Sequence, residues 1–383
     1  MIEAHEVALK DIVNLVSEKF FPSKEDSNVR CINLEDIQEG SGRITSWTSA
    51  SENLSAKTIF KKGDVLFGKL RPYLRKFAQA PFDGVCTTEI MVFRAKDGIA
   101  PDYVYQIISS EDFVEHNVAA SYGTKMPRTD WTTAAKFSFS LPQFNEQLGI
   151  AEVLSALDEQ IEQIDALIAK SVLARLGLYA SLLEVAPPSV QVKEHFELSS
   201  GLTPLRSKTH FYSQSGTPWV KTLDLNEARL KKTDESITQS AFDACSLRVL
   251  PLGTVLVAMY GGWEQIGRTA LLDTAACTNQ AITALTPKIS EEWNPYFVLK
   301  AFQALRHKWR GFAVSTRKDP NITKADIGNF RLPKPSIDEQ NYWAENLEIA
   351  DEVISDYKAE AKKLRLQKQG LMRDLLTGKT RVQ

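Results

Sequence analysis

Apolar residues recur at alternating steps of three and four along two long stretches of the chain. The first stretch runs through Leu154, Leu157, Ile161, Ile164, Ile168, Ser171, Arg175, Leu178 and Leu182. The second runs through Leu347, Ala350, Ile354, Tyr357, Ala361, Leu364, Lys368, Leu371 and Leu375. A mean period near 3.5 is typical of a coiled-coil seam. Each stretch follows a Leu-Pro pair, and the two end near Pro187 and Gly378. The pattern predicts two helices of about 38 residues, each about 57 Å long at 1.5 Å per residue.

The two stretches are copies of one another. A constant offset of 193 residues carries Glu146-Gln147 onto Glu339-Gln340, Asp158-Glu159 onto Asp351-Glu352, and Leu182-Leu183 onto Leu375-Leu376. A single helix of this length with an apolar seam is unstable in water and needs a partner. We expect that partner to be the other copy, in an antiparallel pair, because the intervening chain is long enough to reverse direction. Two ordinary core helices remain the alternative.

The segments before the helices have a different pattern. Short apolar runs at 64–67, 90–93, 254–257 and 281–285 are separated by Gly, Pro, Asp and Asn, which are strand and turn signals. Residues 103–108 and 296–305 are more helical. The expected fold class is α+β: two mixed α/β globular domains with curved sheets, separated by two long helices that form an antiparallel intramolecular coiled coil with a pseudo-twofold repeat. The expected boundaries are 1–143, 144–186, 187–337 and 338–383.

The composition narrows the class of protein. Among 383 residues, 43% are hydrophobic and 25% charged, which excludes collagen-like and disordered chains. Four widely spaced cysteines without a CxxC pair argue against a zinc ribbon or a disulfide-stapled fold. The N-terminal sequence lacks a signal-peptide pattern, and no stretch approaches the roughly 20 apolar residues of a membrane helix. We therefore expect a cytoplasmic protein without membrane contact.

Charge is divided unevenly between the parts. The net charge is −2, but residues 191–337 hold 19 basic and 13 acidic side chains, whereas residues 1–142 hold 17 and 19. Residues 143–190 hold only two basic side chains against seven acidic ones. The excess of basic residues in the second globular segment suggests a polyanionic partner.

Paired loops carry the candidate DNA contacts. The turn at 68–76 is rich in Lys and Arg, and the matching turn at 259–268 carries Tyr, Trp, Gln and Arg; a second pair of basic loops lies at 121–128 and 315–321. Arg and Lys suit phosphate or guanine, and Gln or Asn suits adenine. The candidates are Lys69, Arg71, Arg75, Lys125 and Arg128 in the first segment, and Arg206, Lys208, Tyr260, Trp263, Arg268, Arg317 and Lys318 in the second. Ordinary solvated turns are the alternative.

Signatures of catalysis are weak. The run 294–297, Asn-Pro-Tyr-Phe, is similar to an amino-methyltransferase motif but lacks the second proline, and it matches a helix start at 101–103. Gly378-Lys379-Thr380 ends like a phosphate-binding loop, but Arg373 stands where the first glycine belongs. The paired acids at 158–159 and 351–352 are interpreted as solvated helix faces. We predict no active site and no metal site.

These residues resemble a known family. Leu141-Pro142-x-Phe144-x-Glu146-Gln147, its counterpart from Leu332 to Gln340, and the C-terminal run GLMRDLLTGKTRV at 370–382 are similar to the specificity subunits of type I restriction–modification systems. The resemblance covers the whole chain. It departs at 179–185, where Tyr-Ala-Ser-Leu-Leu-Glu-Val replaces the family's basic, glycine-ended finish.

The resemblance implies a function without an active site in this chain. Each target-recognition domain would read one half of a bipartite double-stranded DNA sequence, and the coiled coil would set the spacer. Two methyltransferase subunits and the restriction subunits would dock on this chain. They would carry S-adenosylmethionine, ATP and Mg, with adenine methylated in the partner after base flipping. A self-sufficient DNA methyltransferase or nuclease, and a coiled-coil adaptor that does not bind DNA, are the alternatives.

Overall fold

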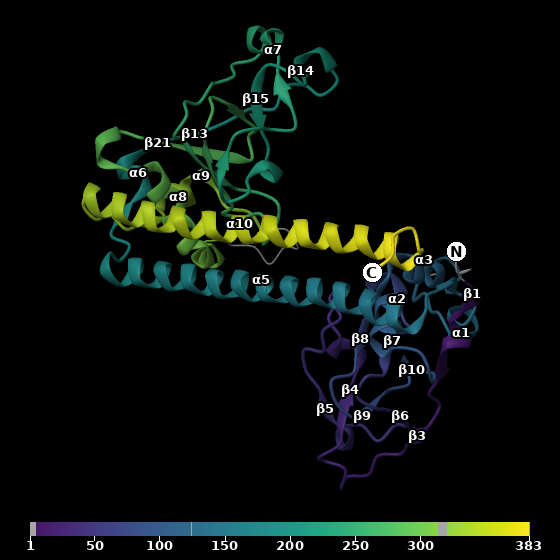
Figure 1. The fold of residues 1–383 in the computed structure, drawn as a ribbon. Coiled ribbons are helices and arrows are strands. Elements are labelled where there is room, and N and C mark those ends of the chain that lie inside the picture. Colours follow the sequence, from purple (N-terminus) through teal and green to yellow (C-terminus); the bar gives the residue numbers. More distant parts are fainter. Residues whose placement is uncertain (1–4, 124, 313–319, 383) are drawn as a thin grey trace. The chain divides into compact units, whose positions relative to one another are not determined.

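The computed structural model describes residues 5–123, 125–312 and 320–382. The chain forms two units, one comprising Met1–Ala166 with Lys358–Gln383 and the other Leu167–Tyr357. Two long helices, α5 (Phe144–Val185) and α10 (Ile337–Leu376), each contribute residues to both units. Figure 1 shows these helices as the longest elements of the chain.

The globular part of the first unit contains three sheets within the part of the chain that the structure describes. Their strand orders are β2-β10-β7-β8, β3-β6-β9-β4-β5 and β1-β11. The strands are β1 (His5–Ala8), β2 (Val13–Leu15), β3 (Lys19–Phe20), β4 (Arg30–Ile32), β5 (Thr48–Ser49), β6 (Lys57–Phe60), β7 (Val65–Gly68), β8 (Phe77–Gln79), β9 (Gly84–Thr87), β10 (Ile90–Ala95) and β11 (Ser138–Leu141). The helices are α1 (Leu9–Ile12), α2 (Pro101–Ser109), α3 (Glu111–Ala119) and α4 (Trp131–Ala134), with 3₁₀ turns η1 (Leu34–Asp36), η2 (Ala50–Glu52) and η3 (Pro72–Leu74). We call this part reader domain 1.

The described residues of the globular part of the second unit, which we call reader domain 2, also form three sheets. Their orders are β13-β21-β18-β19-β16, β14-β17-β15-β20 and β12-β22. The strands are β12 (Val190–Gln191), β13 (Phe196–Ser200), β14 (Tyr212–Ser213), β15 (Thr217–Val220), β16 (Arg229–Leu230), β17 (Ser236–Ile237), β18 (Val255–Ala258), β19 (Thr269–Leu272), β20 (Cys277–Thr278), β21 (Ile282–Pro287) and β22 (Arg331–Leu332). The helices are α6 (Val192–His195), α7 (Gln239–Ala244), α8 (Pro295–Ala304) and α9 (Lys324–Asn329), with 3₁₀ turns η4 (Thr209–Phe211), η5 (Thr222–Asp224), η6 (Ser290–Glu292) and η7 (Arg306–Gly311).

The two reader domains repeat one topology. The order β2-β10-β7-β8 in the first matches β13-β21-β18-β19 in the second. The apolar runs that predicted strands form the central antiparallel pairs, β7 with β10 and β18 with β21. The predicted helical segments form α2 and α8, and each begins with proline, whose fixed φ and missing N–H suit the first helical position. The predicted pair of mixed α/β domains is confirmed.

Each reader helix is anchored on a long helix by a buried glutamine. Gln147 of α5 accepts a hydrogen bond from the N–H of Ala100, which precedes α2, and donates to the carbonyl oxygen of Pro142, both at 3.0 Å. Gln340 of α10 accepts from the N–H of Asn294, which precedes α8, at 3.0 Å and donates to Pro335 at 3.1 Å. These glutamines are 2% and 0% exposed. The glutamine of the repeated Glu-Gln pair thus has a structural role, because it accepts from the backbone N–H that precedes each reader helix.

The long helices pack antiparallel within each unit. In the first unit, Asp158 pairs with Lys368 and Asp165 with Arg365, so residue numbers rise along α5 as they fall along α10. In the second unit, Leu182 and Ala344 lie in one hydrophobic cluster, and Arg175 pairs with Asp351. The predicted antiparallel coiled coil is confirmed.

Burial follows the predicted seam. Leu154, Leu157, Leu347, Ile354 and Leu364 are buried, and Ile161, Ile164, Ile168, Tyr357 and Leu371 are half-buried. The ends of the helices also pack into the reader cores: Leu154 and Leu375 belong to the core cluster of reader domain 1, and Leu347 to that of reader domain 2. The helices therefore bury one stripe against each other and part of it against the domain that each half supports.

The structure corrects the interpretation of two acidic residues. Asp158 and Asp351 are half-buried and ion-paired, whereas their neighbours Glu159 and Glu352 are exposed. The expectation of solvated faces was wrong for the two aspartates. The partners that bury them come from other elements, which a helical period does not identify.

The composition of α5 also differs from expectation. A window of 18 residues in α5 has a mean hydropathy of 1.5, and only 11% of it is buried. By length and composition alone this helix is apolar enough to cross a membrane. This is weak evidence for a membrane span, because the helix pairs with α10.

Truncating the seam should destabilise the second unit. Leu347→Ala is expected to lower the free energy of unfolding by about 2–5 kcal/mol, because a fully buried leucine leaves a cavity. Urea denaturation followed by tryptophan fluorescence measures the change. The control Leu173→Ala removes a side chain that is 68% exposed and is expected to change stability by less than about 0.5 kcal/mol. Equal effects of the two changes would contradict the assignment of the seam.

Candidate nucleic-acid interface

Two basic loops of reader domain 1 are joined into one surface. The turn after β7 and the loop 121–129 are linked by Arg71 N–H donating to the carbonyl oxygen of Pro127 at 2.7 Å. Thr129 N–H donates to the carbonyl oxygen of Lys69 at 2.9 Å. An isolated bridge also pairs Leu70 with Arg128. The structure thereby brings together four of the predicted DNA contacts, Lys69, Arg71, Lys125 and Arg128, on loops separated by about 50 residues of sequence.

The turn itself is strained. Arg71 and Arg75 have φ values of 51° and 53° and flank the 3₁₀ turn η3. Left-handed backbone costs a non-glycine residue on the order of 1–2 kcal/mol, and such strain concentrates at functional sites. Tyr73, between the two arginines, is 51% exposed. The strained turn therefore presents an aromatic ring beside cations, the combination that suits bases and phosphates.

The cations of this surface differ in how far they are engaged. Lys125 is exposed. Lys69 Nζ donates to the carbonyl oxygen of Thr88 at 2.6 Å, and burial lowers its pKa while Glu89 opposes that shift. Arg128 is ion-paired with Glu89. A phosphate approaching Arg128 would compete with that carboxylate.

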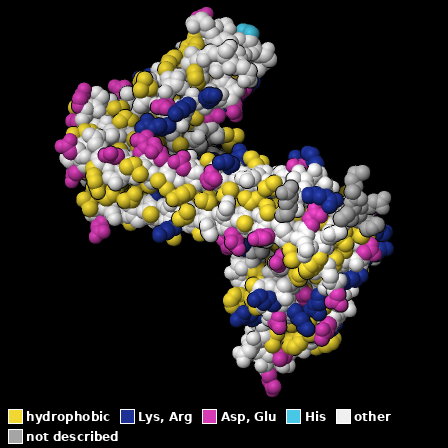
Figure 2. Space-filling view, viewed as in Figure 1, with side chains coloured by type: hydrophobic (Ala, Val, Ile, Leu, Met, Phe, Trp, Pro, Cys, Tyr) yellow, Lys and Arg dark blue, Asp and Glu magenta, His cyan; other side chains and the backbone are white. Residues whose placement is uncertain are grey.

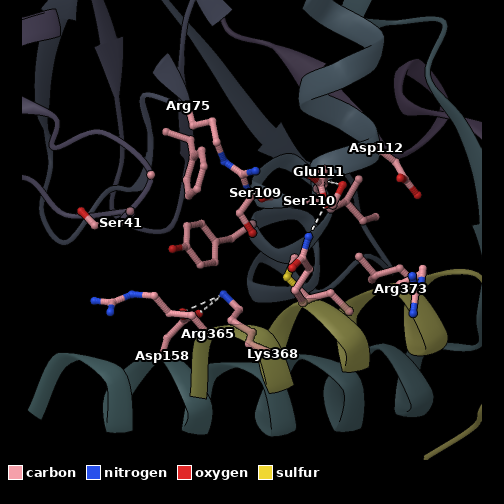
Figure 3. Close-up of a pocket in the computed structure, with 18 of the residues that line it drawn as sticks. Ser41, Arg75, Ser109, Ser110, Glu111, Asp112, Asp158, Arg365, Lys368 and Arg373 are labelled. Atoms are coloured by element: carbon pink, nitrogen blue, oxygen red, sulfur yellow. Dashed lines mark hydrogen bonds and ion pairs between the residues drawn. The ribbon is translucent and has the colours of Figure 1, made fainter. Parts of the chain in front are cut away.

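Arg75 lies apart from the other four. Its guanidinium donates to the carbonyl oxygen of Ser109 at 3.0 Å. It lines a cavity of about 870 Å³ between reader domain 1 and the long helices of the same unit, together with Asp158 and Lys368 (Figure 3). The sequence grouped Arg75 with Arg71 because they share a turn, but the structure points it to this cavity.

The equivalent turn of reader domain 2 presents aromatic residues. Tyr260 and Trp263 are 43% and 49% exposed, and Arg268 is half-buried at the end of the turn. Gly261 has φ 112°, and a Cβ there would lie 2.6 Å from the Cβ of Gln265. Only glycine fits that tight turn. The predicted contacts Arg317 and Lys318 lie outside the described residues.

Arg206 and Lys208 lie in a neighbouring loop of reader domain 2. The loop and the turn both contact residues 280–281. Thr203 of the loop donates to Gln280, and Met259 N–H of the turn donates to the carbonyl oxygen of Ala281. Arg206 itself forms two hydrogen bonds to Glu235, at 2.8 and 2.9 Å.

The Arg206 guanidinium is therefore partly neutralised. Arg206 and Lys221 lower the pKa of Glu235 to about 2, so this carboxylate stays ionised beside them. Lys208 is exposed, with its Nζ 5.2 Å from the ring centroid of Phe211. Of the two, Lys208 is the freer contact for a phosphate.

Sequence reasoning missed Arg30, and although it selected Arg206, it did not identify the aromatic rings on which Arg206 lies. Arg30 lies over the rings of Trp47 and Phe82, at 5.0 and 4.6 Å from their centroids, and Trp47 is 53% exposed. Arg206 lies in the same way over Tyr212 and Trp219, at 4.3 and 4.8 Å. Arg30 begins β4, whose pairing with β5 and β9 brings it near Trp47 and Phe82, whereas Arg206 lies in the loop before β14. No local motif signals either stack. The exposed ring of Trp47 and the arginine beside it form a surface of the kind on which bases stack, whereas Trp219 is buried.

The chain is similar to known proteins over nearly its whole length. The family model described as type I restriction modification DNA specificity domain matches residues 1–170 and 188–366. The MjaVIII specificity subunit of a type I restriction enzyme from Methanocaldococcus jannaschii is 24% identical over 330 residues, 78% of this chain and 75% of that one. The HindI specificity subunit from Haemophilus influenzae is 26% identical over 171 residues, 42% of this chain and 37% of that one.

Two solved structures share the fold. The type I restriction–modification S subunit from M. genitalium superposes with a TM-score of 0.65 at 16% identity, covering 97% of this chain and 96% of that one. A chain from a structure of a type I R-M system, described for its complex assembly and conformational transition, gives a TM-score of 0.59 at 21% identity and covers 98% of both chains. With two matched specificity domains in a repeated fold, the chain belongs to the family of type I restriction–modification DNA specificity subunits.

Proposed function

We propose that this chain reads a bipartite DNA target, one half-site per reader domain, with the paired helices α5 and α10 setting the spacer between the half-sites. The proposal rests on a comparison of two turns that occupy equivalent positions in the repeated topology of the reader domains. After β7 it reads Lys-Leu-Arg-Pro-Tyr-Leu-Arg-Lys, and after β18 it reads Met-Tyr-Gly-Gly-Trp-Glu-Gln-Ile-Gly-Arg. Two domains that share a backbone topology but differ in the side chains of this turn are suited to recognise different base sequences.

We further propose that two methyltransferase subunits dock on the paired helices, and that restriction subunits join this complex. The support is apolar surface that the fold leaves uncovered. In the second unit, Leu173, Leu176 and Val185 of α5 are 68%, 52% and 65% exposed, and Tyr342 and Ile349 of α10 are 60% and 52% exposed. Figure 2 shows hydrophobic side chains gathered along these helices. Exposed apolar surface of this kind is typical of protein interfaces, and docking of a partner protein would cover the apolar residues of α5.

The chemistry would then belong to the partners. S-adenosylmethionine, ATP and Mg would be bound by the methyltransferase and restriction subunits, and adenine would be flipped into the methyltransferase pocket. Among the described residues, no group of three or more His, Cys, Asp or Glu is placed to hold a metal ion. This chain would determine which DNA sequence the complex recognises.

Removing an exposed cation should weaken binding to all sequences alike. Lys125→Ala in the reconstituted complex is expected to lower DNA affinity and to reduce the slope of log K against log salt by about 0.9, because one phosphate contact is lost. Fluorescence anisotropy at several salt concentrations measures both. The control Lys62→Ala removes an exposed lysine from the turn before β7, at the opposite end of that strand from Lys69. Identical slopes for the two variants would contradict the assigned surface.

Each reader domain should act on its own half-site. Trp263→Ala is expected to weaken binding by about 1–3 kcal/mol if a base stacks on this ring, and to relax recognition in one half-site only. Tyr73→Ala is expected to relax the other. Binding competition with duplexes altered in one half-site at a time measures this separation. Relaxation of both half-sites by one substitution would count against one reader per half-site.

Polar replacement of the uncovered leucines should impair assembly. Leu173→Ser with Leu176→Ser is expected to weaken methyltransferase binding by about 3 kcal/mol or more, because each buried leucine contributes roughly 1.5–3 kcal/mol. Analytical ultracentrifugation of the mixed subunits measures the stoichiometry and affinity. The control Leu205→Ser changes a leucine that is 65% exposed in reader domain 2, and it should leave assembly unchanged.

A further inference from the structure

A carboxylate of α5 joins three elements of the first unit. Asp158 accepts from Lys368 Nζ of α10 at 2.6 Å on both carboxylate oxygens. It also accepts from Gln106 Nε2 of the reader helix α2 at 3.3 Å. Figure 3 shows the Asp158–Lys368 pair between the two long helices, at the side of the cavity that faces them. One side chain thus connects both long helices with the reader domain.

A carboxylate of α10 has the same place in the second unit. Asp351 accepts from Arg175 Nη1 of α5 at 2.7 Å and from the hydroxyl of Tyr296 on the reader helix α8 at 2.9 Å. Lys300 of α8, which is 1% exposed, is ion-paired with it as well. Again one carboxylate joins both long helices and a reader helix.

The two junctions are copies with the helices exchanged. Asp158 and Asp351 are 193 residues apart, and so are their partners Arg175 and Lys368. In the first unit α5 supplies the acid and α10 the cation, and in the second α10 supplies the acid and α5 the cation. The two cations are the charged members of the otherwise mostly apolar seam.

The surroundings keep these groups charged and mutually dependent. Burial alone would raise the pKa of Asp351, but Lys300, Arg175 and Tyr296 hold it below its ordinary value. Burial lowers the pKa of Lys300 and of Lys368, and the paired aspartates oppose that shift. Removing one acid would leave a poorly solvated cation without its partner, which is strongly unfavourable.

Ion pairs of this kind specify geometry more sharply than apolar contacts do. Leucines along a seam can exchange neighbours after a small rotation or slide, because dispersion contacts are not directional. A single polar group in a coiled-coil seam is known to fix register at a cost in stability. Here the polar group also holds the reader helix.

We propose that Asp158 and Asp351 are positioning residues that fix the register of α5 against α10 and the orientation of each reader domain on those helices, and so determine which spacer length between the half-sites is accepted. The inference rests on the proposed function, because it assigns the origin of the spacer preference within that function. Neither aspartate would contact DNA.

The test is a spacer series. The wild-type chain and its variants are each assembled with the methyltransferase subunit, and methylation rates are measured on duplexes that keep both half-sites but lengthen or shorten the spacer by one or two base pairs. The half-sites and the native spacer are first read from methylated adenines in the DNA of cells that carry the system. The variants are Asp158→Asn and Asp351→Asn. The matched controls are Glu159→Gln and Glu352→Gln, which neutralise the adjacent exposed acids.

Loss of a positioning carboxylate should change the shape of the spacer profile. The preference for the native spacer over its nearest neighbours is expected to fall roughly tenfold, the consequence of losing about 1.4 kcal/mol of discrimination, while base preference within each half-site is kept. The controls should retain the wild-type profile. An unchanged profile in both Asn variants would overturn the inference, and so would an equal loss of rate at every spacer, which indicates a merely structural role.

Charge exchange provides a second test that does not depend on the stability of the Asn variants. Asp158→Lys combined with Lys368→Asp restores the ion pair in the opposite sense. Gln106 Oε1 has no hydrogen-bond partner among the described residues and can accept from the new lysine. The double variant should recover the native spacer preference, whereas Asp158→Lys alone should not. Failure of the double variant to recover it would overturn the inference, and a wild-type complex with no spacer preference would overturn the proposed function itself.

Discussion

The pairing of one repeat helix with its own copy is the constraint on which the rest of the structure depends. Neither helix of about 60 Å is stable alone, because its length and its apolar stripe require a partner. Because the pairing is antiparallel, each half of the helix pair contains the N-terminal part of one helix and the C-terminal part of the other. Each half then presents the same glutamine, the same aspartate and the same leucines to the reader domain beside it. The helix repeat thus provides the two reader domains with equivalent packing surfaces.

The polar residues within the seam give this pairing its specificity. A wholly apolar stripe would bury comparable area in more than one register, since the hydrophobic effect depends on area and hardly on direction. Lys368 and Arg175 interrupt the stripe, and each finds a half-buried carboxylate on the opposite helix. A register that separated either cation from its carboxylate would be disfavoured, because a poorly solvated charge would then be left without a partner. In the seam, apolar burial therefore stabilises the helix pair, and the two ion pairs favour one register.

Elements that repeat along the chain or have a regular apolar period could be predicted from the sequence. The two helices followed from the 193-residue offset and the 3.5 period, and their ends followed from the flanking proline and glycine residues. Their antiparallel sense was favoured by the length of the intervening chain. The strands β7, β10, β18 and β21 followed from short apolar runs between turn residues. The partners of Asp158 and Asp351 did not follow, because a pattern along one helix shows which face is polar and not what lies opposite it. The joining of the 68–76 turn to the 121–129 loop, and the turning away of Arg75, depend on backbone hydrogen bonds between distant segments. The stacking of Arg30 on Trp47 and Phe82 depends on strand pairing in the same way.

The internal repeat allows one chain to serve as its own comparison. Several residues that are identical at the offset of 193 have structural roles: Gln147 and Gln340 anchor the reader helices, Asp158 and Asp351 join three elements, and Leu154 and Leu347 fill equivalent cores. The turns after β7 and β18 occupy equivalent positions but share almost no side chains. Since both copies must satisfy the same packing, side chains that differ freely between them are not required by the fold. Their chemistry is therefore available for contacts outside the chain, and cationic and aromatic side chains on exposed turns are suited to DNA.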